Sequence, residues 1–195
     1  MTRLDLAPIA AHDPEPVSGT RREAAVLVPV LEREDGHHLI FTKRADHLGE
    51  HPGQMSFPGG GVEPEDRDRL ETALREANEE ISLPPAEADL VGRLDDIRTI
   101  TEYAVSPFVA RVPDLPYEPD EREVAEVVPL SLSGLLDPAN FEYETRSHPH
   151  YGDIVVHYFH VDGYTVWGAT GRILVQLLEL ATPFEPPVDP GSAVS

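Results

Sequence analysis

The feature that most constrains the fold is a segment rich in glycine and proline that leads directly into a patterned helix. Residues 51 to 66, HPGQMSFPGGGVEPED, contain four glycines and three prolines. Glycine permits close backbone approach and proline fixes φ, so the segment predicts tight, defined turns. In the following RLETALREANEEISLPP, apolar residues recur at the spacing of one helix face, at Leu70, Ala73, Leu74, Ala77 and Ile81. We therefore expect a helix over about residues 68 to 82, with Asp66 or Asp68 as its cap.

Three glutamates on this helix point to chemistry. At about 100° per residue, Glu76 and Glu80 lie about 40° apart beside the apolar stripe, whereas Glu79 points away from it. Arg75 stands one turn before Glu79, where an ion pair can form. Two carboxylates one turn apart repel each other, and a divalent cation such as Mg²⁺ or Mn²⁺ reverses the sign of that interaction. The competing interpretation is a solvated acidic face, because the chain contains 21 glutamates.

Composition excludes several classes of function. The chain of 195 residues has no cysteine, which excludes disulfides, thiolate metal sites and cysteine nucleophiles. Its net charge is -21, with Lys43 as the only lysine, so we expect no binding to nucleic acid or to anionic membranes. This charge is typical of a halophilic protein. Without an apolar run that could span a bilayer or act as a signal peptide, the protein is expected to be soluble and cytoplasmic.

Short apolar and β-branched runs predict strands along most of the chain. They lie at residues 24 to 32, 37 to 44, 88 to 94, 103 to 112, 123 to 130, 141 to 146 and 153 to 161. A second helix is expected over about residues 168 to 181. Many strands with few helices favour an α/β fold with a mixed sheet between helices. We expect one domain over residues 23 to 182, between an N-terminal tail (1 to 22) and a Pro-rich C-terminal tail (183 to 195).

The glycine turn and the helix together resemble the signature of the Nudix hydrolases, a box of the form GX5EX7REUXEEXGU in which U is aliphatic. Gly60 begins the box here, Arg75 and Glu76 supply RE, and Glu79 and Glu80 supply EE. The resemblance implies a Nudix-type α/β/α sandwich that hydrolyses nucleoside diphosphate derivatives with the help of Mg²⁺ or Mn²⁺.

The chain departs from this box at two positions. The acidic residue expected eight positions before Arg75 is Arg67, so Asp66 takes its place with one inserted residue. Ser82 replaces the closing glycine, a modest cost at a helix end. The first departure concerns an auxiliary metal ligand, and neither changes the three glutamates.

The preceding segment, FTKRADHLGEHPGQMSFPGG, is similar to an additional motif of the coenzyme A pyrophosphatase branch of this family, roughly LLTxRSx3Rx3Gx3FPGG. The matching residues are Thr42, Arg44, Ala45, Gly53, Phe57, Pro58, Gly59 and Gly60. Gly49 stands where the branch has a further arginine. VWGATGRILVQLL is similar to the closing helix of the branch, and we assign the ring of Trp167 in it to core packing. The resemblance covers roughly residues 24 to 182.

For this branch the implied reaction is the hydrolysis of coenzyme A or its derivatives to 3',5'-ADP and 4'-phosphopantetheine. The implied catalytic residues are Arg75, Glu79 and Glu80, the implied metal ligands are Glu76, Glu79, Glu80 and Gly60, and the implied substrate-binding residues are Arg44, His51, Gly53, Phe57, Gly59 and Gly60. The base that activates water stays open between Glu63, Glu79, Glu80 and Glu102.

Two other functions stay open. Because of Gly49, the substrate can be another small nucleoside diphosphate derivative, such as ADP-ribose, NADH or a nucleotide triphosphate, and a non-catalytic nucleotide sensor is the remaining alternative. The sequence is compatible with a monomer or a homodimer. A histidine metal site is not expected, because His157 and His160 differ in parity along one strand and so face opposite sides, while His148 and His150 lie on a turn.

Overall fold

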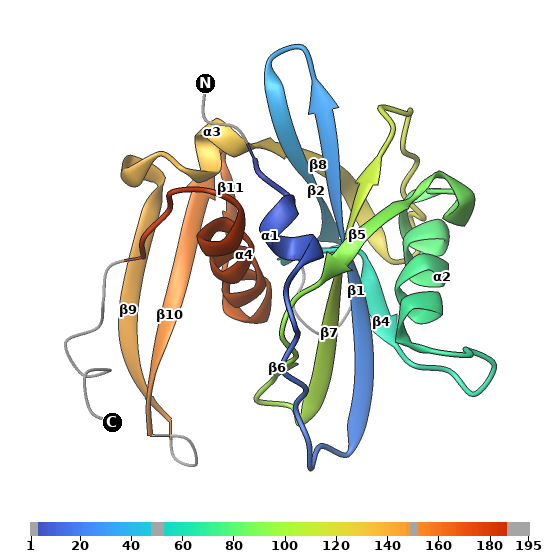
Figure 1. Ribbon diagram of the computed structural model, residues 1–195, viewed down its shortest axis with the longest axis horizontal. Helices are drawn as coiled ribbons and strands as arrows, with labels where there is room; N and C mark the ends of the chain where they lie inside the picture. Colours follow the sequence, from blue (N-terminus) through green and yellow to red (C-terminus); the bar gives the residue numbers. More distant parts are fainter. Residues whose placement is uncertain (1–3, 48–52, 149–151, 187–195) are drawn as a thin grey trace.

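The computed structural model describes residues 4 to 47, 53 to 148 and 152 to 186 (Figure 1). Its strands are β1 (Arg22–Arg33), β2 (Gly36–Arg44), β3 (Met55–Ser56), β4 (Gly59–Gly61), β5 (Asp89–Arg93), β6 (Ile97–Arg98), β7 (Tyr103–Val112), β8 (Val124–Ser131), β9 (Phe141–His148), β10 (Gly152–Val161) and β11 (Tyr164–Val166). Its helices are α1 (Ala7–Ala10), α2 (Arg69–Ile81), α3 (Leu132–Leu135) and α4 (Gly168–Ala181). Each strand and helix predicted from the sequence has an observed counterpart within a few residues.

The main sheet is mixed, as predicted. Its order is β3-β2-β1-β7-β5, with β8 paired to β2, β4 to β1 and β6 to β7. The central strands β1 and β7 run parallel, and the other pairs are antiparallel. Helix α2 covers one face of this sheet, and α1 and α4 lie on the other (Figure 1). The α/β/α layers of the prediction are therefore present.

A second sheet, β11-β10-β9, lies on the far side of α4 and was not anticipated (Figure 1). Helix α4 is buried over most of its circumference, because it packs against the first sheet on one side and against β10 on the other. A helix that is apolar almost all round is one that other elements enclose. The apolar run in residues 168 to 181 thus reflects a helix held between two sheets.

The glycine and proline segment fills a gap in the main sheet. Strands β1 and β2 pair near their connecting turn, from Val30↔Leu39 to Arg33↔Gly36, and then diverge. Between them, β3 pairs with β2 and β4 pairs with β1. The expected turn is therefore corrected to two short strands, which were missed because glycine has little intrinsic preference for strands.

The N-terminal segment is also corrected. Leu4, Leu6 and Ile9 are buried in the core, where α1 packs against α4 and β5. The backbone N–H of Asp5 donates to the carbonyl of Ala181 at 2.8 Å. Residues 4 to 12 are thus a packed part of the fold, which lack of periodicity had concealed.

The C-terminal end of the described chain packs as well, since Phe184 lies edge-on to Phe141 with ring centroids 5.5 Å apart. Residues 187 to 195, most of the expected C-terminal tail, lie outside the described residues. In the described part of the chain, no helix has the length and apolarity that crossing a membrane requires.

Candidate active site

The glutamate side chains of helix α2 point in the directions that the sequence predicted. Asp68 caps the helix by accepting a hydrogen bond from the Glu71 N–H at 2.8 Å, so of the two expected caps Asp68 is the observed one. Ala73, Ala77 and Ile81 are fully buried against the sheet. This orientation brings Glu76 and Glu80 towards β4 and leaves Glu79 exposed. Ser82 ends the helix with φ 58°, the left-handed conformation that a glycine adopts more easily.

Glu76 and Glu80 meet the glycines of β4. The Glu80 carboxylate accepts a hydrogen bond from the Gly59 N–H at 3.2 Å. A Cβ atom on Gly60 would lie 2.3 Å from Oε1 of Glu76, so only glycine leaves room for that carboxylate. Burial raises the pKa of Glu76, and burial together with the charges of Glu76 and Glu123 raises the pKa of Glu80 to about 8.

The pairing of β4 with β1 decides which glycine atoms face the helix. Leu27 N–H donates to the Pro58 carbonyl at 2.8 Å and Val62 N–H donates to the Glu23 carbonyl at 3.0 Å. Every second pair of an antiparallel ladder exchanges hydrogen bonds, so Gly60 lies in such a pair with Ala25. The Gly60 carbonyl oxygen therefore accepts a bond within the ladder and keeps a second lone pair, so the expectation that Gly60 is a metal ligand stays a prediction. The absence of a side chain on Gly60 leaves space for the Glu76 carboxylate.

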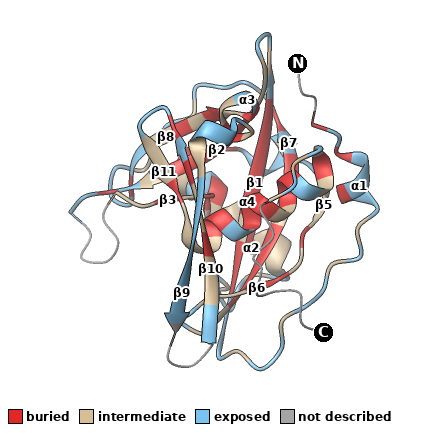
Figure 2. Ribbon diagram, turned by 90° about the vertical axis from the view of Figure 1, so that its left-hand side faces the viewer, coloured by how far each residue is buried: buried red, intermediate tan, exposed pale blue. Residues whose placement is uncertain are grey.

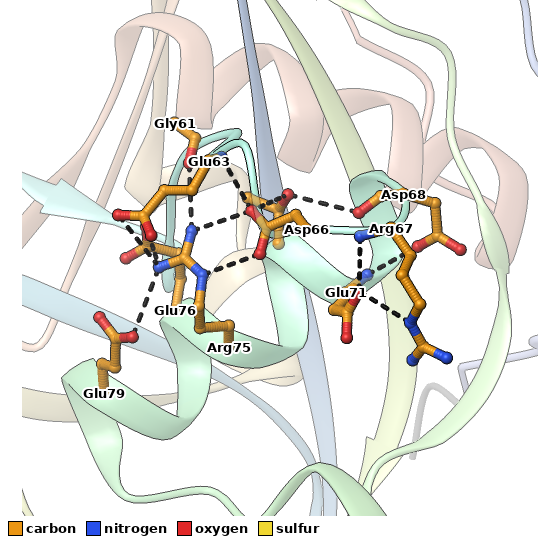
Figure 3. Close-up of polar contacts among 10 residues, drawn as sticks. Gly61, Glu63, Asp66, Arg67, Asp68, Glu71, Arg75, Glu76 and Glu79 are labelled. Carbon is orange, nitrogen blue, oxygen red and sulfur yellow. Dashed lines mark hydrogen bonds and ion pairs between the residues drawn. The ribbon is translucent and has the colours of Figure 1, made fainter.

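Arg75 connects the helix with the loop that precedes it (Figure 3). Its guanidinium donates two hydrogen bonds to Asp66, at 3.0 and 3.1 Å, one to Glu76 at 3.0 Å and one to the Gly61 carbonyl at 3.2 Å. The predicted pair with Glu79 is present but longer, at 3.4 Å. Arg75 thus fixes the position of Glu76 relative to β4.

Asp66 is a structural partner of this arginine. Its bonds to Arg75, with further donation from the Glu63 N–H and the Thr72 hydroxyl, hold the pKa of its carboxyl far below the usual range. Both of its oxygens are engaged by Arg75. Asp66, to which the sequence gives the place of the acidic residue of the box, therefore joins the loop to the helix through its carboxylate.

Sequence reasoning missed a second acidic segment at this site. A cavity of about 250 Å³ is lined by Glu79, Glu80, Asp120, Arg122 and Glu123. The segment reaches α2 because the Asp120 N–H donates to the backbone carbonyl of Glu80 at 3.0 Å. The acidic run EPDERE before β8 is visible in the sequence, but nothing in it indicates that it lies against α2.

The donor set fits a hard divalent cation. In the described residues no group of three or more His, Asp or Glu side chains is arranged to hold a metal ion as it stands. Glu76 and Glu80 nevertheless converge at β4 with raised pKa values, which is the mark of negative charge without enough compensation. Mg²⁺ commonly binds through one or two carboxylates and takes its other ligands from water and substrate phosphates. Glu76 and Glu80, the second of which lines the cavity, match that requirement.

The predicted substrate-binding residues lie in different environments. Arg44 ends β2, and its charge acts on Glu80 against the raised pKa of that carboxyl. Gly53 has φ +71° and its N–H donates to the Arg44 carbonyl at 3.1 Å. Phe57 is corrected: its ring is 2% exposed and stacks on Phe41 at 4.5 Å, so it belongs to the core. His51 lies outside the described residues.

Gly59 lies beside Glu80, and a Cβ atom on it would lie 2.4 Å from the carbonyl oxygen of Ala25. Of the other candidate bases, Glu63 lies 4.0 Å from Arg75, and Glu102 lies 3.7 Å from Arg98 at the turn between β6 and β7.

Trp167, His157 and His160 lie on β10 or beside it. Trp167 is half-buried outside the core clusters and stacks on Tyr158, with ring centroids 6.0 Å apart, which corrects the core assignment. His157 stacks on Phe141, whereas His160 is exposed beside Tyr158, so the two face opposite sides of β10 as predicted. His150 and the side chain of His148 lie outside the described residues.

A family model described as NUDIX domain matches residues 21 to 159. The protein named Uncharacterized Nudix hydrolase NudL from Enterobacter sp. (strain 638) is 39% identical over 163 residues, which cover 80% of this chain and 81% of that protein. The protein of the same name from Cronobacter sakazakii (strain ATCC BAA-894) has the same identity and coverage.

Among solved structures, a MutT/nudix family protein from Enterococcus faecalis matches 86% of this chain and 64% of its own, with a TM-score of 0.57 and 14% identity. At that identity the likeness concerns the fold alone.

Proposed function

The chain belongs to the Nudix hydrolase family, and from that premise we propose that it cleaves the diphosphate of coenzyme A or its derivatives. Water would attack one phosphorus atom and the bridging P–O bond would break, which gives 3',5'-ADP and 4'-phosphopantetheine. The observation that carries the proposal is the contact between two sequence motifs. The segment from Thr42 to Gly60, which resembles the coenzyme A motif, ends on β4 against Glu76 and Glu80.

Each side chain of this site has its own proposed role. Glu76 and Glu80 would hold Mg²⁺ or Mn²⁺, which supplies charge neutralisation of the diphosphate and a lowered pKa for water. Arg75 keeps the Glu76 carboxylate in place through its fork of hydrogen bonds. Glu79 and Glu123 border the cavity, and either would accept a proton from water. Arg44 supplies positive charge on the same side of β2 for a substrate phosphate.

A second substrate class stays open for a specific reason. Gly49 replaces an arginine of the coenzyme A motif, and this removes a cation that would meet an anionic substrate. ADP-ribose, NADH and nucleotide triphosphates contain the same phosphoanhydride and need the same carboxylates. The alternative proposal is a hydrolase for one of these.

Parallel incubations test the substrate. The pure protein is incubated with Mg²⁺ or Mn²⁺ at high salt with coenzyme A, ADP-ribose, NADH and a nucleotide triphosphate, and the products are identified by mass. Release of 4'-phosphopantetheine from coenzyme A alone supports the proposal. Preferential cleavage of another compound replaces it with the alternative, and no turnover of any of them contradicts the catalytic role and favours a nucleotide sensor.

Glu80→Gln tests the role of the carboxylate, because it keeps the shape of the side chain and removes its charge. We expect turnover to fall by at least about 100-fold while the circular dichroism spectrum stays unchanged. The matched control is Glu87→Gln, at an exposed glutamate just beyond the same helix, which should keep the wild-type rate. Near-normal activity of Glu80→Gln would remove Glu80 from the proposed metal site.

A further inference from the structure

A second cavity of about 380 Å³ lies between the end of β2 and the β10–β11 hairpin. Figure 2 shows β11 beside β3, and the two strands are in contact. The lining consists of Lys43, Gly53, Gln54, Met55, Gly163, Tyr164, Thr165 and Trp167. Among the described residues, the lining thus combines the only lysine and the only tryptophan of the sequence and includes no carboxylate, although the sequence has 36 acidic residues. A lining of this kind suits an anionic ligand with an aromatic part.

This cavity is on the opposite face of the main sheet from the glutamates. Along β2, Leu39 and Phe41 belong to the core cluster under α4, whereas Ile40 belongs to the cluster under α2. Side chains alternate along a strand, so Lys43 follows Phe41 and Arg44 follows Ile40. Lys43 therefore faces α4 and β11, and a ligand bound to it does not compete for space with a metal held by α2.

The aromatic wall of the cavity is held in place. Trp167 stacks on Tyr158 with an interplanar angle of 17°, and the guanidinium of Arg146 lies 6.0 Å from the indole centroid. Arg146 is itself fixed by the Tyr158 hydroxyl at 2.7 Å and by Glu144. A fixed ring loses little conformational freedom when a planar ligand stacks on it.

The lysine is available to such a ligand. In the part of the chain that the structure describes, no ion pair involves Lys43. The carboxylate opposite it in the β2–β8 register is Glu126, which instead accepts a hydrogen bond from the Tyr164 hydroxyl at 2.7 Å. With the described residues, the ammonium group therefore has no ion pair to break before it meets a phosphate.

We propose that this cavity binds a phosphorylated nucleoside, with its base against Trp167 and a phosphate at Lys43. Aromatic side chains stack on any nucleobase, and lysine binds phosphate as a compact point charge. The nucleotide has two possible sources. It is either the adenosine phosphate half of the substrate, which rests on the proposed function, or a separate free nucleotide, which does not.

Intrinsic fluorescence tests the binding directly, because Trp167 is the only tryptophan. Without metal, adenosine 3',5'-bisphosphate should quench it saturably and adenosine more weakly, whereas inorganic phosphate and 4'-phosphopantetheine should not. Lys43→Gln should weaken the bisphosphate at least about tenfold and leave adenosine unchanged, and Lys43→Arg should restore binding. Absence of saturable quenching, or equal affinity in Lys43→Gln, would overturn the proposal.

Turnover separates the two sources. If the bisphosphate competes with coenzyme A and Lys43→Gln raises KM, the cavity holds the substrate half. If the bisphosphate binds without changing KM, the cavity holds a separate nucleotide, and the binding proposal stands in both cases. Glu80→Gln should abolish turnover and keep quenching. Quenching in a protein that hydrolyses no diphosphate would contradict the proposed function and leave this inference intact.

Discussion

Three consecutive glycines form β4, and substituting each by alanine should give three different results. A Cβ atom on Gly59 would lie 2.4 Å from the Ala25 carbonyl oxygen and 2.7 Å from the Cα of Val26, which are both backbone atoms. A Cβ atom on Gly60 would lie 2.3 Å from Oε1 of Glu76, the far end of a side chain. A Cβ atom on Gly61 would meet nothing within 4 Å.

The magnitudes follow from which atoms must move. At Gly60 the Glu76 carboxylate must retreat by roughly 1 Å, and a misplacement of about 1 Å at a reacting centre costs on the order of 100-fold in rate. Its stability should change little, because a flexible side chain absorbs the shift. At Gly59 the backbone of β1 must move, and overpacking of this kind costs about 1–3 kcal/mol of unfolding free energy. For a chain of this size that lowers Tm by about 2–4 °C per kcal/mol.

Two measurements on the three variants test this: initial rates on the substrate that the parallel incubations select, and thermal unfolding monitored by circular dichroism. Gly60→Ala should lose rate and keep Tm, Gly59→Ala should lose Tm, and Gly61→Ala should resemble the wild type in both. A wild-type rate for Gly60→Ala would refute the reasoning, because Glu76 would then not need its observed position. Equal losses in Gly60→Ala and Gly61→Ala would refute it as well, since the steric contact would not be the cause.

The remaining predictions concern groups that hold the site and the core together. Arg75→Lys keeps the charge but loses the pair of hydrogen bonds to Asp66. The free energy of unfolding should therefore fall by about 1–3 kcal/mol and turnover by at least tenfold. An unchanged urea midpoint would contradict this. Burial acts to raise the pKa of Asp96, but hydrogen bonds from Ser106 and Arg93 outweigh burial and lower it. A carboxyl group whose pKa is lower in the folded state stabilises the fold at pH values above its unfolded-state pKa of about 4. That stabilisation is lost as the pH falls through the folded-state pKa. Asp96→Asn should therefore cost about 3–5 kcal/mol at pH 7 and flatten the pH dependence of Tm below about pH 4, and a parallel pH profile would count against it. Ile9→Ala should cost about 2–5 kcal/mol in urea unfolding, whereas a loose N-terminal tail would give no change.

The sequence was sufficient for α2 because two independent patterns coincide there. The apolar spacing fixed which face is buried, and from that face the directions of Glu76, Glu79 and Glu80 follow. Strand positions were also predictable, because runs of β-branched residues give a local signal. The predictions that failed depend on contacts between distant segments. Ile9 is buried in the core although the residues around it show no apolar periodicity, and Asp120 contacts Glu80 from a loop.

Some residues were assigned to the wrong environment because chemistry alone does not give position. Phe57 lies within the segment that resembles a substrate motif, but alternation along β3 and the following residues directs its ring to Phe41. Trp167 lies at the start of an apolar helix, yet it precedes the first turn and so stays at the surface of the smaller sheet. In both cases the orientation of one residue relative to its element decides between core and site.

The distribution of cations shows how a chain with net charge -21 can accept an anionic substrate. At molar salt the Debye length is about 3 Å, so the overall negative charge hardly repels a phosphate and the overall field cannot attract one either. Binding must then come from groups in direct contact. Arg75 is committed to Asp66 and Glu76, and Arg69 and Arg93 are committed to Asp96. These arginines stabilise the scaffold, so contact with the ligand would fall to Lys43 and to the metal ion proposed at Glu76 and Glu80. Affinity for a nucleotide should therefore depend on single contacts, and one substitution at Lys43 should change it more than a large change in surface charge elsewhere.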